Sequence, residues 1–307
     1  MVMTLPAGMH VFERGWLSSN NILLTGAGQT ALIDSGYCTH SAQTLALVRS
    51  VLGGNTPLDL LLNTHLHSDH CGGNAALQGA YAPLQTWIPP GQAAEVAQWD
   101  RAVLSFDATG QSCPRFAYDA LLVPGSSIEL AGETWQVHAA AGHDPHSVIL
   151  FNASNGILVS ADALWEQGFG IVFPELDGVD AFDEVSATLD LIEDLSPAGV
   201  IPGHGSPFVD HKKALAFARS KLRYFVEQPV KHMQYAAKVL LKFKLLEMQS
   251  CTVADLLQWV AATPYLERLR LNLYPTLSQA EMLDALICDL AKSGAAIRVQ
   301  DRVLNGT

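Results

Sequence analysis

A cluster of histidine and aspartate at residues 64–74, THLHSDHCGGN, constrains this chain more than any other feature. Three histidines and an aspartate, His65, His67, Asp69 and His70, fall within six consecutive positions. Their imidazole and carboxylate groups are ligands that suit zinc, iron or manganese. Because His65 and His67 are two apart, they project to one side of an extended segment, and a bend after them aims Asp69 and His70 elsewhere. The cluster therefore predicts two metal ions at a strand-to-loop junction.

The neighbouring residues support this placement. The apolar run at 58–62 predicts a short strand buried on both faces, and Cys-Gly-Gly-Asn at 71–74 predicts a loop or the start of a helix. Ligands at the carboxyl end of a strand are typical of open α/β sheets. The alternative is a histidine-rich surface loop that binds metal by accident, which the strand-to-loop context disfavours.

Further ligand-type residues lie at other junctions marked by glycine or proline. They are found in AGHDPHS at 141–147, at Asp162 after an apolar run, and at His204 within IPGHGSP. Taken singly, each has an ordinary explanation, since His138 suits a strand position and Asp162 could cap a helix. Their shared placement makes His143, Asp162 and His204 candidates for the same site.

With these motifs in this order over roughly residues 10–210, the chain resembles the metallo-β-lactamase superfamily. The resemblance implies a four-layer αββα sandwich, in which two packed sheets lie under outer helices. It also implies a dinuclear site with seven ligand residues. The first ion is assigned to His65, His67 and His143, the second to Asp69, His70 and His204, with Asp162 bridging both.

The resemblance gives further residues a role near the site. Asp34, after the apolar residues 31–33, is expected to support the metal loop through hydrogen bonds. The third motif departs from the usual His-Thr-Pro-Gly, because it reads HDPH at 143–146. The extra His146 could contact substrate, replace a ligand or bond to a loop carbonyl, and His143 is kept as the ligand. Trp165, Phe169 and Phe173 follow Asp162 and either wall the pocket or fill core.

Hydrolysis is the reaction expected of such a site. Two divalent cations lower the pKa of a bridging water and polarise the substrate oxygen, so a metal-bridging hydroxide is the expected nucleophile. Asp69 and Asp162 are the expected catalytic residues. Zn²⁺ is the expected metal, with iron or manganese as alternatives, because the same ligands accept all three.

Composition sets the outer limits. A chain of 307 residues with 49% hydrophobic residues can bury a large core. No stretch approaches the ~18–20 apolar residues of a membrane span, and no leader peptide is visible at the first residues. The five cysteines show no framework spacing. A cytoplasmic protein that does not enter the membrane is expected.

The C-terminal part differs in character from the rest. Residues 211–244 hold nine Lys and Arg against Glu227 as the only acid, in a chain of net charge −12. The apolar residues at 211–227 have helical spacing, and Pro229 breaks the helix. Two capping boxes and a β-ribbon at 296–304 follow. This order resembles a winged helix. We therefore expect a catalytic domain at 1–210 and a small, mainly helical, winged-helix-like domain at 211–307.

The expected function is hydrolysis of a small ester, thioester or lactone. The main rival is a ribonuclease or phosphodiesterase that uses the C-terminal module to hold RNA. Nucleic acid is disfavoured as a partner, because the acidic catalytic region repels polyphosphate. A role in docking or in a homodimer contact is favoured for the basic helices. A β-lactamase and a non-catalytic metal-binding protein are the less favoured alternatives.

Overall fold

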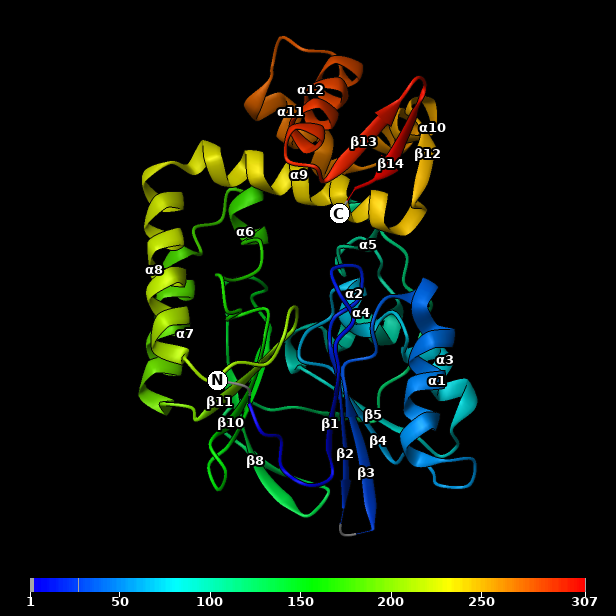
Figure 1. The fold of residues 1–307 in the computed structure, drawn as a ribbon, viewed down its shortest axis with the longest axis vertical. Helices are drawn as coiled ribbons and strands as arrows, with labels where there is room; N and C mark the ends of the chain where they lie inside the picture. Colours follow the sequence, from blue (N-terminus) through cyan, green and yellow to red (C-terminus); the bar gives the residue numbers. More distant parts are fainter. Residues whose placement is uncertain (1–2, 27, 307) are drawn as a thin grey trace. The chain divides into compact units, whose positions relative to one another are not determined.

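A computed structural model describes residues 3–26 and 28–306 of the chain. By its contacts the chain divides into two compact units (Figure 1). The first unit comprises Met1–Asp100 and Cys113–Arg223, and the second Arg101–Ser112 and Tyr224–Thr307. The domain boundary expected after residue 210 stays a prediction. No described helix combines the length and apolar character that crossing a bilayer requires.

The first unit contains a six-stranded sheet. Its strands, in spatial order, are β1 (Met9–Phe12), β2 (Asn21–Gly26), β3 (Gln29–Ile33), β4 (Leu60–Leu62), β5 (Gln85–Ile88) and β6 (Ala120–Leu121). The first three strands pair antiparallel, whereas β3 to β6 run parallel. The carboxyl end of β4 therefore opens into the metal loop at one edge of this sheet.

A second sheet of five strands belongs to the same unit. Its strands are β7 (Ser127–Leu130), β8 (Glu133–Ala139), β9 (Val148–Asn152), β10 (Ile157–Ala161) and β11 (Gly199–Pro202), in the spatial order β11-β10-β9-β8-β7. Only the β10–β11 pair is parallel. Since parallel strands end at the same edge of a sheet, Asp162 after β10 and His204 after β11 emerge side by side.

The two sheets pack face to face around one apolar core. Leu60 and Leu62 of β4 lie in this core with Trp135 of β8 and Leu150 of β9. Leu61, which points the other way as alternate strand residues do, lies in a second cluster. The strand β4 is thus buried on both faces, as its run of leucines predicts.

Helices cover the outer faces of the two sheets (Figure 1). The second cluster joins Leu61 to Val48 of α1 (Ser41–Leu52) and Leu77 of α3 (Asn74–Ala80). Beside β10 and β11 lie α7 (Phe182–Leu195) and α8 (His211–Glu227), of which the residues up to Arg223 belong to this unit. Arg219 of α8 is paired with the carboxylates of Asp190 and Glu193 on α7. The remaining helices of this unit are η1 (Cys38–His40), α2 (Ser68–Cys71), η2 (Pro90–Gln92), α4 (Ala93–Gln98) and α6 (Phe173–Leu176).

The second unit combines helices with a small sheet. Its elements are α5 (Phe106–Thr109), α9 (Pro229–Met248), β12 (Ser250–Thr252), α10 (Val253–Ala261), α11 (Pro264–Leu273), α12 (Gln279–Lys292), β13 (Ala296–Val299) and β14 (Arg302–Asn305). The strands are antiparallel in the order β12-β14-β13. The Lys242 ammonium donates to the carbonyls of Ala295 and Gly306, so it holds the end of the chain on α9. The winged-helix assignment stays a prediction.

The mixed α/β fold expected from the sequence is confirmed, and so are several local features. The helix α1 buries Val48 and Leu52, which lie four residues apart on one face. Both capping boxes form, with Thr252 and Ser278 as the N-caps. Pro229 is at the first turn of α9, where a proline that lacks an N–H is tolerated. The segment 87–125 contains the end of β5, the short helices η2, α4 and α5, and the strand β6.

We predict that Leu150→Ala lowers the free energy of unfolding by about 2–5 kcal/mol, because it leaves a cavity between the sheets. Leu150 is 0% exposed. The matched control is Val179→Ala, at a position that is 57% exposed, for which a change within about 0.5 kcal/mol is expected. Urea denaturation of both variants measures the difference, and equal losses would contradict this core.

Candidate metal centre

Two glycines hold the loop after β4 close to the rest of the sheet. A Cβ on Gly72 would lie 2.6 Å from the backbone nitrogen of Cys38, and one on Gly73 would lie 2.5 Å from the Ser35 carbonyl oxygen. Any side chain at these positions would push the loop away. The Cys-Gly-Gly stretch after His70 therefore serves close packing of the backbone, which fixes the direction of α2.

The first group of candidate ligands consists of His65, His67 and His143. One donor atom from each lies within 4.8 Å of the others. The Nδ1 of His67 is 2.8 Å from the Nε2 of His143. His143 comes from the loop after β8, so the second sheet delivers this imidazole to the two from the first sheet. The two sheets therefore bring three imidazoles together in one group.

The second group consists of Asp69, His70, Asp162 and His204. The Nε2 of His204 is 3.1 Å from the Oδ2 of Asp69, and the Nε2 of His70 is 3.9 Å from the same oxygen. This group is more acidic than the first, since two of its four members are carboxylates. It again draws on both sheets, because Asp162 and His204 follow β10 and β11.

The carboxylate of Asp162 lies between the two groups. Its Oδ2 is 3.4 Å from the Nε2 of His143 in the first group. Its Oδ1 is 3.5 Å from the Nε2 of His70 and 3.8 Å from the Nε2 of His204 in the second. One carboxylate therefore presents a separate oxygen to each group, as a bridging ligand does.

The donor sets fit two divalent cations. Atoms bound to one ion at about 2.0–2.2 Å stand roughly 3–4 Å apart. The distances given above within the two groups, from 2.8 to 3.9 Å, are close to this range. The Nε2 atoms of His65 and His70 are buried with no hydrogen-bond partner. Leaving such an atom unsatisfied is unfavourable by about 1–3 kcal/mol. A cation in each group would satisfy both nitrogens.

Asp34 follows the last residue of β3 and holds the loop after β4 through hydrogen bonds. Its Oδ1 accepts the Thr64 backbone N–H at 2.9 Å, and its Oδ2 accepts the Thr64 hydroxyl at 2.8 Å. The same Oδ2 lies 2.8 Å from the Nδ1 of His70. Asp34 has a φ of +58°, a backbone conformation that non-glycine residues adopt mainly where the surroundings fix them. These bonds leave the Nε2 of His70 as the nitrogen that faces inward.

Backbone carbonyls orient two further imidazoles in the same way. The Nδ1 of His143 contacts the carbonyl oxygen of Ile171, and the Nδ1 of His204 lies 2.9 Å from that of Gly15. Because a carbonyl only accepts, each Nδ1 carries the proton. The Nε2 of each ring is then the unprotonated nitrogen, which is the form that binds a metal.

The two groups differ in electrostatics. Burial, together with the neighbouring imidazole of His143, lowers the pKa of His67 to about 4, so this ring is neutral at neutral pH. Burial also acts to lower the pKa of His70, but the carboxylates of Asp34, Asp162 and Asp69 raise it well above its usual value. The carboxylates around His70 therefore favour a positive charge at this place, as those of a cation site do.

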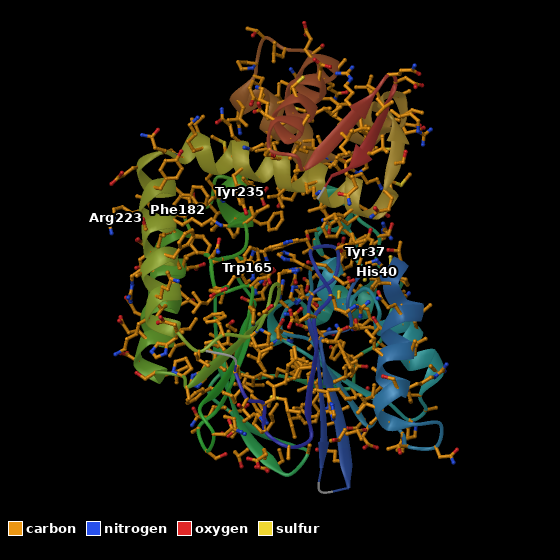
Figure 2. All side chains as sticks on the ribbon, in the orientation of Figure 1. Tyr37, His40, Trp165, Phe182, Arg223 and Tyr235 are labelled. Carbon is orange, nitrogen blue, oxygen red and sulfur yellow. The ribbon has the colours of Figure 1, made fainter. Side chains whose placement is uncertain are left out.

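The remaining candidates of the sequence lie at the edges of the centre. The indole Nε1 of Trp165, labelled in Figure 2, donates to the Oδ1 of Asp162 at 3.1 Å. Phe169 is buried beside the same segment.

Three other candidates lie elsewhere around the centre. His146 packs against Gly91, where an added Cβ would lie 2.1 Å from the Nδ1 of His146. Phe173 is edge-on to His67, with ring centroids 4.9 Å apart. His138, on β8, lies beside Gln136 and is in neither group.

Trp16 is a residue of the site that the sequence does not indicate. It lies in the loop between β1 and β2, is 55% exposed, and its ring stacks on that of His204 with centroids 5.3 Å apart and planes inclined by 14°. It also meets Trp165 edge-on at 5.2 Å. Nothing in the spacing near residue 16 marks it, since its partners are about 150 and 190 residues further along.

Comparison with known proteins gives a consistent family. The family model described as the metallo-beta-lactamase superfamily matches residues 14–204. The beta-lactamase-like protein 2 homolog of Drosophila melanogaster is 25% identical over 240 residues, which cover 71% of this chain and 72% of that protein.

Solved structures share the fold. A metallo-beta-lactamase family protein from Thermus thermophilus has a TM-score of 0.59 at 20% identity and covers 98% of this chain and 100% of its own. A beta-lactamase domain protein from Burkholderia ambifaria has a TM-score of 0.57 at 20% identity, covering 98% of this chain and 96% of its own. These likenesses extend over nearly the whole chain, but they concern the fold alone.

We predict that Gly203→Ala lowers turnover by about 10²-fold, because its Cβ would lie 2.1 Å from the Oδ1 of Asp162 and displace that carboxylate. The matched control is Gly79→Ala in α3, where an added Cβ meets nothing within 4 Å. Metal content and steady-state rates of both variants check this. Full activity in the Gly203 variant would show that the position of Asp162 is unimportant.

Proposed function

The chain belongs to the metallo-beta-lactamase superfamily, and we propose how its site catalyses hydrolysis and which class of substrate it accepts. It is a metal-dependent hydrolase, since this fold carries a His/Asp cluster able to hold metal. We propose that its substrate is a small ester, thioester or lactone. The observation that carries the mechanism is the Asp162 carboxylate, which offers one oxygen to each group of ligands.

The seven side chains would hold two cations, as two sets of ligands that share Asp162. His65, His67 and His143, with the Oδ2 of Asp162, would hold the first ion, and Asp69, His70 and His204, with its Oδ1, the second. Two bound divalent cations supply an activated water and take up charge that develops on the substrate oxygen. The nitrogen-rich first group suits Zn²⁺, and we propose zinc for both positions, with iron and manganese as tested alternatives.

Asp69 is placed to handle a proton. Its side chain is 14% exposed, compared with 6% for Asp162, so it lies nearer the mouth of the site. Its Oδ2 lies 3.1 Å from the Nε2 of His204. A carboxylate in this place can accept the proton of the attacking water and return it to the leaving group. Asp162 is more deeply buried and accepts a hydrogen bond from Trp165, and it holds the two groups of ligands in place relative to each other.

Aromatic side chains at the mouth favour a small apolar substrate. Trp16 and Trp165 lie beside His204, and Phe173 lies beside His67 and His143. These rings present apolar faces on both sides of the ligand groups. The acyl or alkyl part of an ester, thioester or lactone would gain from contact with them, so we propose Trp16 and Phe173 as substrate contacts. Trp165, Phe169 and His146 stay predictions in that role, and we expect Trp165 to act through Asp162.

Binding of RNA has weaker support. Several of the basic side chains at 211–244 are already engaged within their own unit. Arg219 is paired with Asp190 and Glu193, Lys221 donates to the carbonyl of Phe169, and Lys244 is paired with Glu247. Fewer cations are therefore free to contact phosphates than the sequence suggests. The homodimer, the cytoplasmic location and the winged helix stay predictions.

We predict two metal ions per chain for the native protein, measured by plasma mass spectrometry. Asp162→Ala should keep its fold by circular dichroism, bind fewer than two ions and lose turnover by at least about 10²-fold, because the ligand shared by both ions is gone. Asp190→Ala, which removes an exposed carboxylate on α7, is the control and should retain metal and activity. An Asp162 variant with normal turnover would refute the dinuclear mechanism.

We predict that the protein hydrolyses aryl esters and thioesters and does not cleave RNA. The test is a panel of carboxylic ester, thioester, lactone, β-lactam, phosphodiester and RNA substrates, run with zinc-, manganese- and iron-loaded protein. Trp16→Ala should raise KM for an aryl ester about 2–10-fold with little change in kcat, as expected for loss of one aromatic contact. Val123→Ala, at another exposed apolar position, is the control. Cleavage of RNA that is abolished in the Asp162 variant, without ester turnover, would favour the ribonuclease.

A further inference from the structure

Asp144 occupies one of the two positions at which the third motif departs from its usual sequence, and the ligands of the proposed centre do not include it. Its side chain is almost fully buried, with 7% exposed. Its Oδ1 accepts the backbone N–H of His146 at 2.7 Å. Its other oxygen, Oδ2, lies 3.7 Å from the Nε2 of His67. One carboxylate therefore connects the loop after β8 to an imidazole of the first group.

The two nitrogens of His67 have opposite surroundings. The Nδ1 faces inward, 2.8 Å from the Nε2 of His143, whereas the Nε2 faces the carboxylate of Asp144. A neutral imidazole carries its proton on one nitrogen only, and the other is the metal-binding atom. A carboxylate opposite the Nε2 favours the proton there, and so leaves the Nδ1 lone pair directed at the centre of the group.

We propose that Asp144 is a positioning residue that fixes the orientation and tautomer of His67, and thereby strengthens binding of the first ion. This inference rests on the proposed dinuclear site. Each other imidazole of the first group has a neutral oxygen at its outer nitrogen, the Thr64 hydroxyl for His65 and the Ile171 carbonyl for His143. His67 differs from these two because the oxygen opposite its outer nitrogen, at 3.7 Å, belongs to a carboxylate.

The surrounding turn holds Asp144 in place for this role. The Ser147 hydroxyl contacts the carbonyl oxygens of Ala140 and Asp144 and so closes the turn. The His146 ring fills the space beside Gly91 that a Cβ would otherwise occupy. His146 therefore acts in packing of the loop. With the Oδ1 of Asp144 committed to the His146 N–H, its Oδ2 has little freedom other than to face His67.

The test is Asp144→Asn in the full-length protein. The amide oxygen can still accept the His146 N–H, so the turn is retained, but the amide NH₂ then faces the Nε2 of His67 and opposes a proton there. We expect one of the two steps of a zinc titration against a chromophoric chelator to weaken about 10–100-fold, with the other step unchanged. In long-range ¹H–¹⁵N spectra of the zinc-loaded native protein we expect His67 as the Nε2–H tautomer, and loss of that signal pattern in the variant.

Two further variants separate this role from a structural one. Asp34→Asn, which alters the contact of His70 instead, should weaken the other step of the titration. Asp144→Thr, which restores the common motif residue, should weaken the same step as Asp144→Asn while the metal-free melting temperature stays within a few degrees of the native one. Two ions bound with native affinity by both Asp144 variants would overturn the inference and leave the proposed function standing. A native protein that binds no metal would overturn both.

Discussion

The buried carboxylate of Asp162 contacts imidazoles of both ligand groups, and the two sheets must be packed so that these side chains meet. Asp162 and the histidines around it are taken out of water at the ends of strands from two different sheets. Burial of so many polar groups is unfavourable unless each finds a partner. In the first unit, Asp34, the Thr64 hydroxyl and backbone carbonyls contact the outer nitrogens, so that the inner nitrogens are left for cations.

The framework that makes this possible follows largely from local sequence. The continuous leucines of β4 indicate a strand covered on both faces, and the capping residues Thr252 and Ser278 mark two helix starts. These features depend on neighbours within a few positions, which a sequence displays directly. The association of Arg101–Ser112 with the second unit does not, because it depends on contacts such as that of Trp259 with Gly110 across about 150 residues.

The candidate centre shows the same division. Ligand-type residues at strand ends can be identified because parallel neighbouring strands such as β10 and β11 must end at the same edge. The contacts of their outer ring nitrogens cannot be identified from the sequence, because any residue offers a backbone carbonyl like that of Ile171 or Gly15. Trp16 and the Oδ2 of Asp144 also escape a sequence-based search, because side-chain direction is set by tertiary packing rather than by spacing.

Anomalous diffraction from crystals of the zinc-loaded protein, recorded on both sides of the zinc absorption edge, would locate each bound ion. We expect two peaks per chain, one among His65, His67 and His143 and one among Asp69, His70 and His204, with the Asp162 carboxylate between them. A single peak, or none within bonding distance of Asp162, would contradict a centre built around one shared carboxylate.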